Sequence, residues 1–200
     1  IIVGIITAAG AVAFPLSASA ANYYVAPNGN DSYTNAQAQN LATPWKTIRK
    51  AASVMVAGDT VNIVAGTYTE TVDMQNSGTS TNPIVYQNYN NGIVILPNGI
   101  RVSKNYITVK GLELLDSMVI DGSYCRILEN YIHNAGTNGM FIHGGYNLIR
   151  GNKIANNGSA WGGQITTGWT NGAPDAHHIV FEYNEVSDEQ GQGEDLMQYM

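Results

Sequence analysis

The most constraining feature of the sequence is a repeat. Four stretches superimpose without a gap, with apolar, polar and apolar side chains at fixed places: 107–114, 125–132, 147–154 and 179–186. Their starts are 18, 22 and 32 residues apart, so the repeating unit is a coil whose turns carry insertions. One short coil cannot bury its own apolar side chains and must stack on copies of itself. The chain is therefore expected to form a solenoid.

Equivalent residues of the repeat form columns. Two apolar columns should point inward, namely Val109, Ile127, Ile149 and Phe181, and Leu114, Ile132, Ile154 and Val186. Between them lies a polar column of Leu112, Asn130, Asn152 and Asn184. Asn tolerates the left-handed backbone of tight turns, and its amide can hydrogen-bond along a stack. We interpret this column as a structural ladder where each coil bends.

Two further columns fall at turns. Asp116, Asn134, Asn156 and Asp188 are interpreted as a second turn ladder. Tyr106, Tyr124, Tyr146 and His178 are interpreted as rings stacked at a turn, with carbohydrate contact as the alternative. The single cysteine, Cys125, falls in an inward column with Ile107 and Ile179, so it should be a buried apolar residue and no disulfide framework is expected.

Composition places the chain among turn-rich globular proteins. Charged residues make up only 12% of the 200 residues, and there are 22 Gly and 12 Tyr. The net charge of −6 disfavours nonspecific binding to nucleic acid or to an anionic membrane surface. One domain, or a piece of one, and a monomer are expected.

The first twenty residues carry no charge. An apolar run over 1–6 is followed by Ala18-Ser19-Ala20, a small-residue cleavage box. Residues 1–20 are therefore interpreted as a secretory signal peptide that lacks its start, and the protein is expected outside the cell or in the periplasm. A membrane anchor is the alternative, which Pro15 disfavours, so no stable membrane insertion is expected. We expect the chain to be a piece of a longer protein at both ends.

The segment after residue 20 predicts a cap for the solenoid. Residues 23–32 read as a strand followed by a loop of turn residues. Thr43-Pro44 predicts the start of an amphipathic helix of about three turns that ends near Gly58. A strand from Val61 follows. The domain is thus expected over 21–200, with the cap at 21–60 and the coils from about 61, and the helix can cover the open end of the stack.

These opening motifs carry a family resemblance. The runs 24–32, 44–48, 57–63 and 65–68 resemble the start of secreted bacterial right-handed parallel β-helix proteins of the pectate lyase superfamily, including family 9 polysaccharide lyases. The resemblance covers 23–200 in layout and implies an all-β right-handed parallel β-helix with an N-terminal amphipathic capping helix. It also implies a Ca²⁺-binding acidic cluster near a coil strand and a Lys that acts as the base. Asp195 matches a metal-ligand Asp, and no Lys follows it.

Extending the repeat to a second strand of each coil predicts a shared surface. Alternation directs one set of side chains outward: Arg101 and Ser103, Val119 and Asp121, Phe141 and His143, Thr166 and Gly168, and Met197 and Tyr199. One position earlier lie Gly99, Ser117, Gly139, Gln164 and Asp195. Since parallel coils stack about 4.8 Å apart, these residues should form one contiguous strip.

The strip offers candidates for catalysis. His143 should lie one coil after Asp121, close enough for a hydrogen bond that orients the imidazole, with Arg101 beside them as a charge stabiliser. An ordinary cross-coil polar pair is the alternative. Gln164 and Tyr199 on the strip, and Trp169 in the insertion 168–178, are candidates for substrate binding. A loop packed by its own Trp is the alternative for the insertion.

Acidic residues gather near the end of the chain. Seven of the fifteen acids fall in 175–195, where no Lys or Arg is found. Carboxylates on loops suit Ca²⁺, and the candidate ligands are Asp188, Glu189, Glu194 and Asp195. A solvated acidic surface is the alternative.

Three functional hypotheses follow. The favoured one is Ca²⁺-assisted cleavage of an acidic polysaccharide by β-elimination. A hydrolase on the same fold would use paired carboxylates such as Asp121 with Asp195. A noncatalytic adhesive solenoid would need only the stack.

Overall fold

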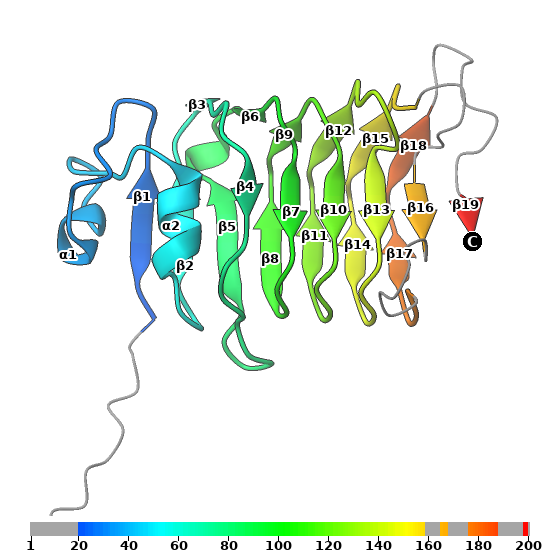
Figure 1. Cartoon of the computed structure of the whole chain (residues 1–200), viewed down its shortest axis with the longest axis horizontal. Coiled ribbons are helices and arrows are strands. Elements are labelled where there is room, and N and C mark those ends of the chain that lie inside the picture. Colours follow the sequence, from blue (N-terminus) through cyan, green and yellow to red (C-terminus); the bar gives the residue numbers. More distant parts are fainter. Residues whose placement is uncertain (1–19, 159–164, 168–175, 188–197, 200) are drawn as a thin grey trace, which may run out of the picture.

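The chain forms a stack of parallel coils that build three sheets, and each coil after the first strand contributes one strand to each sheet (Figure 1). This computed structural model describes residues 20–158, 165–167, 176–187 and 198–199. Every strand pairing is parallel within these residues, and neighbours in a sheet come from successive coils. The expected parallel β-helix is therefore confirmed.

The three sheets are called A, B and C. Sheet A contains β1 (Asn22–Val25), β2 (Thr60–Ile63), β5 (Ile84–Asn88), β8 (Ile107–Lys110), β11 (Arg126–Leu128), β14 (Leu148–Arg150) and β17 (Val180–Glu182). Sheet B contains β3 (Gly66–Thr67), β6 (Val94–Leu96), β9 (Glu113–Leu114), β12 (Tyr131–His133), β15 (Lys153–Ala155) and β18 (Glu185–Ser187). Sheet C contains β4 (Val72–Asp73), β7 (Ile100–Val102), β10 (Met118–Ile120), β13 (Met140–Ile142), β16 (Ile165–Thr167) and β19 (Gln198–Tyr199).

The strand register confirms the inward columns of the repeat. Val109, Ile127, Ile149 and Phe181 are successive partners in sheet A. In sheet B the successive partners are Leu114, Ile132, Ile154 and Val186. Side chains that alternate inward from all three sheets fill one apolar core along the stack. Cys125 lies in this core, and burial raises the pKa of its thiol to about 11.

The Asn column is a continuous ladder of hydrogen bonds. The Asn130 side chain donates to Asn152 Oδ1 at 3.0 Å, and the Asn152 side chain donates to Asn184 Oδ1 at 3.0 Å. The same oxygens accept the backbone N–H of the preceding coil, so buried donors that would otherwise be unpaired are satisfied. The expected ladder is confirmed.

The expectation that these Asn residues adopt the left-handed backbone is wrong. The left-handed residues of these turns are those directly before the column: Gly111, Glu129, Gly151 and Tyr183. The Asn residues point inward because their amides must reach carbonyls of the preceding coil, such as that of Val109. The second turn ladder does use left-handed Asn, at Asn134 and Asn156. Asp116 is not left-handed and instead accepts the Ser117 N–H, while Asp188 lies outside the described residues.

The aromatic column is a stack of rings. Tyr106, Tyr124, Tyr146 and His178 all have φ between 54° and 59°, and successive ring centroids are 5.0, 4.8 and 4.6 Å apart. Aromatic residues rarely adopt this backbone, so stacking offsets part of the strain. Because neighbouring rings cover each other's faces, the inner rings expose their edges rather than a platform for a sugar. The stacked-ring interpretation is confirmed.

The capping helix is shorter and starts later than expected. Helix α2 (Ile48–Val54) has Thr47 as its N-cap, whereas Trp45 is extended and forms a parallel bridge with Val25. Trp45 and Ile48 have the three-residue spacing of one face of a helix, which led to the longer prediction. Trp45 instead stacks on Tyr23. The helix buries Ile48, Ala51 and Ala52.

The two short helices cover different parts of the N-terminal end (Figure 1). Helix α2 contacts β4, the edge strand of sheet C, as well as β1. Helix α1 (Asn35–Ala38) packs on β1, the edge strand of sheet A. A 3-10 turn, η1 (Tyr89–Asn91), joins β5 to β6. No helix in the described part is long and apolar enough to cross a membrane.

Candidate functional site

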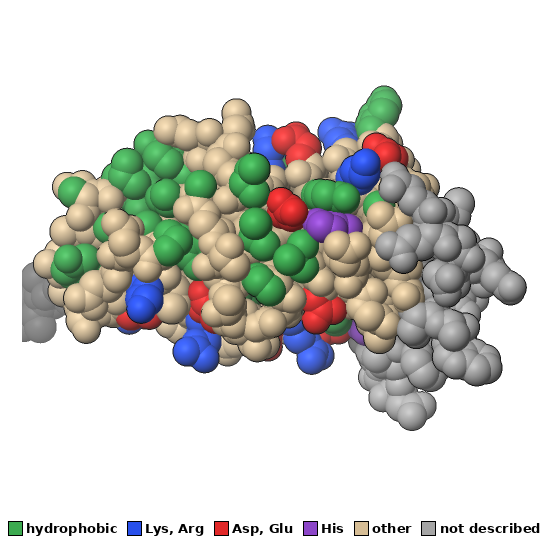
Figure 2. Space-filling view, turned by 90° about the horizontal axis from the view of Figure 1, so that it is seen from above, with side chains coloured by type: hydrophobic (Ala, Val, Ile, Leu, Met, Phe, Trp, Pro, Cys, Tyr) green, Lys and Arg blue, Asp and Glu red, His purple; other side chains and the backbone are tan. Residues whose placement is uncertain are grey.

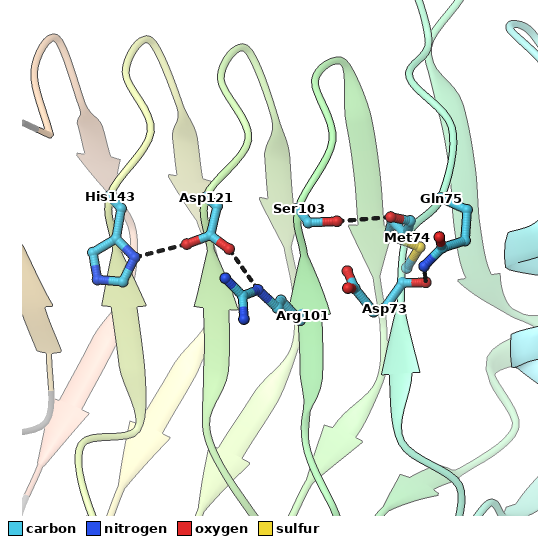
Figure 3. Close-up of polar contacts among 7 residues, drawn as sticks. All are labelled: Asp73, Met74, Gln75, Arg101, Ser103, Asp121 and His143. Atoms are coloured by element: carbon cyan, nitrogen blue, oxygen red, sulfur yellow. Dashed lines mark hydrogen bonds and ion pairs between the residues drawn. The ribbon is translucent and has the colours of Figure 1, made fainter. Parts of the chain in front are cut away.

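The outward face of sheet C carries two columns of side chains. The first is Asp73, Arg101, Val119, Phe141 and Thr166, which are successive register partners. The second lies two residues further along the strands and holds Ser103, Asp121 and His143 (Figure 3). We call the set Asp73, Arg101, Ser103, Asp121 and His143 the sheet C strip. The predicted neighbourhood of Arg101, Asp121 and His143 is confirmed.

Asp121 joins its two neighbours through both carboxylate oxygens. Its Oδ1 lies 2.8 Å from His143 Nδ1, and its Oδ2 accepts from Arg101 Nε at 2.6 Å (Figure 3). The side chains of Arg101, Asp121 and His143 are 58%, 23% and 8% exposed. Asp121 is thus the fixed centre of the strip, with the buried imidazole on one side and the solvated guanidinium on the other.

The contact with Asp121 fixes the tautomer of His143. An ionised carboxylate only accepts hydrogen bonds, so Nδ1 must carry the proton and a neutral ring has its lone pair on Nε2. Nε2 points away from Asp121 (Figure 3), is buried, and finds no hydrogen-bond partner among the described residues. An unsatisfied buried acceptor costs about 1–3 kcal/mol. The strip therefore holds an oriented nitrogen base with an unfilled hydrogen-bonding position.

Asp73 is a member of the strip that the sequence-based reasoning missed. It pairs in register with Arg101, and its Oδ1 is buried without a hydrogen-bond partner in the part of the chain that the structure describes. The sequence does contain the pattern that places Asp73 here. Val72-Asp73 shows the same alternation of inward and outward residues one coil before Ile100, where the alignment of this strand began. Arg101 therefore lies between two carboxylates and pairs with Asp121.

A second His–carboxylate pair, also missed, lies on sheet B. His133 Nε2 is 3.1 Å from Glu113 Oε1, and the Tyr131 ring stacks on the imidazole with centroids 4.0 Å apart. Lys153 lies over the Tyr131 ring and forms an ion pair with Glu185. Extending the repeat alignment by one residue beyond 132 would have found it.

One predicted substrate-binding residue is misplaced. The register pairs Thr166 with Gln198 and Thr167 with Tyr199, one residue off the alignment expected from the sequence. Tyr199 is therefore in register with Thr167 and not with Gly168 as expected. A slip of one residue exchanges the two faces of a strand, so the register gives no support for Tyr199 on the strip.

Other predicted site residues lie outside the described residues. These are Gln164 and Trp169 for substrate and Asp188, Glu189, Glu194 and Asp195 for Ca²⁺. Within the part that the structure describes, no group of three or more His, Cys, Asp or Glu gathers to hold a metal ion. The Ca²⁺ site therefore stays a prediction about the acidic cluster.

Charge is dispersed over the surface. On the face shown in Figure 2, acidic and basic side chains are interspersed, and hydrophobic side chains gather towards the N-terminal half. On sheet A, Lys110 pairs with Glu129 and Arg150 with Glu182.

Comparison with known proteins supports the fold assignment. The family described as "Pel9A-like, right handed beta helix region" matches residues 23–192. Among curated proteins, the uncharacterized protein YwoF of Bacillus subtilis (strain 168) is 32% identical over 151 residues, which cover 70% of this chain. The chain spans 31% of the length of YwoF.

Solved structures share the architecture at low identity. A rhamnogalacturonan lyase matches with a TM-score of 0.69 and 19% identity over 82% of this chain and 51% of that one. Pectate lyase Pel9A matches with a TM-score of 0.64 and 21% identity over 74% and 43%. A GH136 lacto-N-biosidase from Eubacterium ramulus matches with a TM-score of 0.63 and 14% identity over 82% and 41%. At these identities the likeness shows the fold alone.

Proposed function

Because the chain belongs to the Pel9A-like right-handed β-helix family, we propose that it is part of a secreted enzyme that cleaves an acidic polysaccharide by β-elimination. The observation that supports this most is the sheet C strip, where Asp121 orients His143 and leaves one imidazole nitrogen without a partner among the residues that the structure describes. The polysaccharide would lie along the strip, across successive coils.

His143 would serve as the base. In β-elimination the base takes the proton from the carbon next to the uronate carboxylate, and the electron pair of that C–H bond becomes a carbon–carbon double bond. The glycosidic C–O bond breaks, and its oxygen departs as the hydroxyl of the other fragment after receiving a proton. Nε2 would hold the abstracted proton, and Asp121 would stabilise the resulting imidazolium. Access to Nε2 requires that the groups covering it move aside, and this movement is part of the proposal.

Asp121 is a positioning residue in this proposal. Both of its oxygens are engaged, by His143 and by Arg101, so its contacts suit a residue that holds these two side chains in place. The hydrolase hypothesis, in which Asp121 would pair with Asp195, stays the alternative.

Calcium belongs to the proposal through the acidic residues near the end of the chain. Asp188, Glu189, Glu194 and Asp195 supply the hard oxygen donors that Ca²⁺ prefers. When bound, Ca²⁺ would neutralise the uronate carboxylate and so acidify the neighbouring C–H.

The test is an activity assay on the whole protein. Pectate, rhamnogalacturonan and alginate are each incubated with the enzyme, with and without a chelator, and the absorbance of the unsaturated product is followed. We expect the signal on at least one uronate polymer and its loss with chelator. Release of reducing sugar without unsaturated product would instead indicate a hydrolase. If neither product forms while a polysaccharide still binds, the protein is an adhesive solenoid.

A further inference from the structure

Arg101 has guanidinium N–H groups that donate to no other residue of the sheet C strip. Its Nε donates to Asp121, and no other protein partner contacts the guanidinium among the described residues. A guanidinium has five N–H donors, so the four on its terminal nitrogens remain. With 58% of the side chain exposed, these donors face solvent at the centre of sheet C. We propose that they bind the carboxylate of one uronate residue and select acidic chains over esterified or neutral ones.

The guanidinium is held in place before any ligand arrives. Arg101 is in β7, which pairs with β4 on one side and β10 on the other, so its backbone is fixed within the sheet. Asp121 holds Nε, and His143 in turn holds Asp121. A planar fork that is already oriented loses little freedom on binding, and its two parallel N–H groups match a carboxylate.

The local charge limits how strong this selection can be. Asp73 and Asp121 flank Arg101, so with a neutral His143 the sheet C strip carries a net charge of −1 from two carboxylates and one guanidinium. The surrounding field therefore does not attract a uronate, and selectivity must come from the directed contact with the terminal nitrogens. An exposed contact of this kind changes affinity by about fivefold.

Sheet A supplies a matched control residue. Arg126 is exposed on the outward face of β11 and forms no ion pair among the described residues. Lys110 and Arg150 are less suitable, because each already pairs with a Glu. The Arg126→Gln variant therefore removes the same charge from the same protein at a different face.

The inference rests on the proposed function for its ligand class, and binding can test it without turnover. Calorimetry on the whole protein compares oligogalacturonate and oligoalginate, each in free-acid and methyl-esterified form, in the presence of a chelator that stops the proposed Ca²⁺-dependent cleavage. Wild type should prefer the free acid, and Arg101→Gln should lower that preference about fivefold. Arg101→Lys, which keeps the charge without the fork, should fall in between, and Arg126→Gln should match wild type.

The outcomes separate the two proposals. If wild type binds neither free-acid oligosaccharide, both the acidic substrate and the role of Arg101 are overturned. If wild type prefers the free acid and Arg101→Gln keeps that preference undiminished, the inference about Arg101 fails while the acidic substrate stands. Equal loss in Arg126→Gln would show an effect of net charge and would also overturn the inference. Thermal unfolding of each variant checks that the fold is intact.

Discussion

The two His–carboxylate pairs of this β-helix look alike and differ in what surrounds them. On sheet C, His143 presents Nδ1 to Asp121 and keeps Nε2 without a partner. On sheet B, His133 presents Nε2 to Glu113. In each case the carboxylate comes from one coil and the imidazole from the next, because parallel stacking brings outward side chains of successive coils together.

The neighbours of each pair show why the same pairing can have different roles. Tyr131 covers a face of the His133 ring, and Lys153 with Glu185 completes a chain of contacts on sheet B. Asp121 instead holds an exposed guanidinium, and a carboxylate oxygen of Asp73 lies buried and unpaired one coil away. Side chains on sheet B are thus linked into a chain of contacts, whereas the sheet C strip, among the described residues, leaves a buried base, a buried acceptor and a set of donors unused. Cross-coil pairing is therefore a consequence of the fold, and unused groups are what mark a candidate site.

The largest expected difference between the two pairs is in turnover. Replacing His143 with Gln removes the proposed base and should lower the rate of unsaturated-product formation by at least about a hundredfold. The matched variant His133→Gln should change the rate less than about twofold, since His133 has no part in the proposed chemistry. Initial rates on the preferred uronate polymer measure both. Comparable losses in the two variants would show that sheet C has no special role.

A smaller difference is expected from the carboxylates. Asp121→Asn should lower kcat at least about tenfold, because an amide can donate to Nδ1 and so favour the tautomer that carries its proton on Nε2. KM should change less than kcat, since the amide oxygen of Asn can still accept from Arg101 Nε. Glu113→Gln is the control and should leave both constants near wild type. An unchanged kcat in Asp121→Asn would rule out a positioning role for Asp121.

The smallest difference should be in stability. Both imidazole pairs include partly exposed carboxylates, so His143→Gln and His133→Gln should each change the free energy of unfolding by about 1 kcal/mol or less. Asn152→Ala, by contrast, leaves buried backbone groups unpaired and should cost about 3 kcal/mol. Urea unfolding measures all three. If His143→Gln destabilised the fold as much as Asn152→Ala, the pair would belong to the framework.

The repeat allowed the core and the strip to be predicted because both depend only on alternation and stacking. Once Met118 and Ile120 are placed inward in one coil and Met140 and Ile142 in the next, alternation places Asp121 and His143 outward as neighbours. The Asn ladder followed from the same columns. Glu113 and His133 were missed because the alignment stopped one residue short, and not because the pattern was absent.

Features that depend on which of several possible local contacts forms could not be predicted from the repeat. Trp45 has the spacing of a helical face, but stacking on Tyr23 and pairing with Val25 keep its backbone extended. The register of β19 is one residue away from the expected alignment, because Leu196 and Met197 are adjacent apolar residues in the sequence and the pattern does not choose between them. Which nitrogen of each imidazole meets its carboxylate likewise depends on side-chain rotamers, which a sequence pattern does not encode.

The most direct test is to observe both imidazoles while an acidic oligosaccharide binds. Nitrogen NMR of the histidine rings in the whole protein distinguishes protonated from unprotonated ring nitrogens, and single His→Gln variants assign His133 and His143. Before ligand is added, the neutral His143 ring should carry its proton on Nδ1. Titration with the oligouronate that binds should then shift the His143 Nε2 signal and leave that of His133 in place. Saturable binding that moves the signals of His133 alone, or of neither residue, would contradict the assignment of function to the sheet C strip.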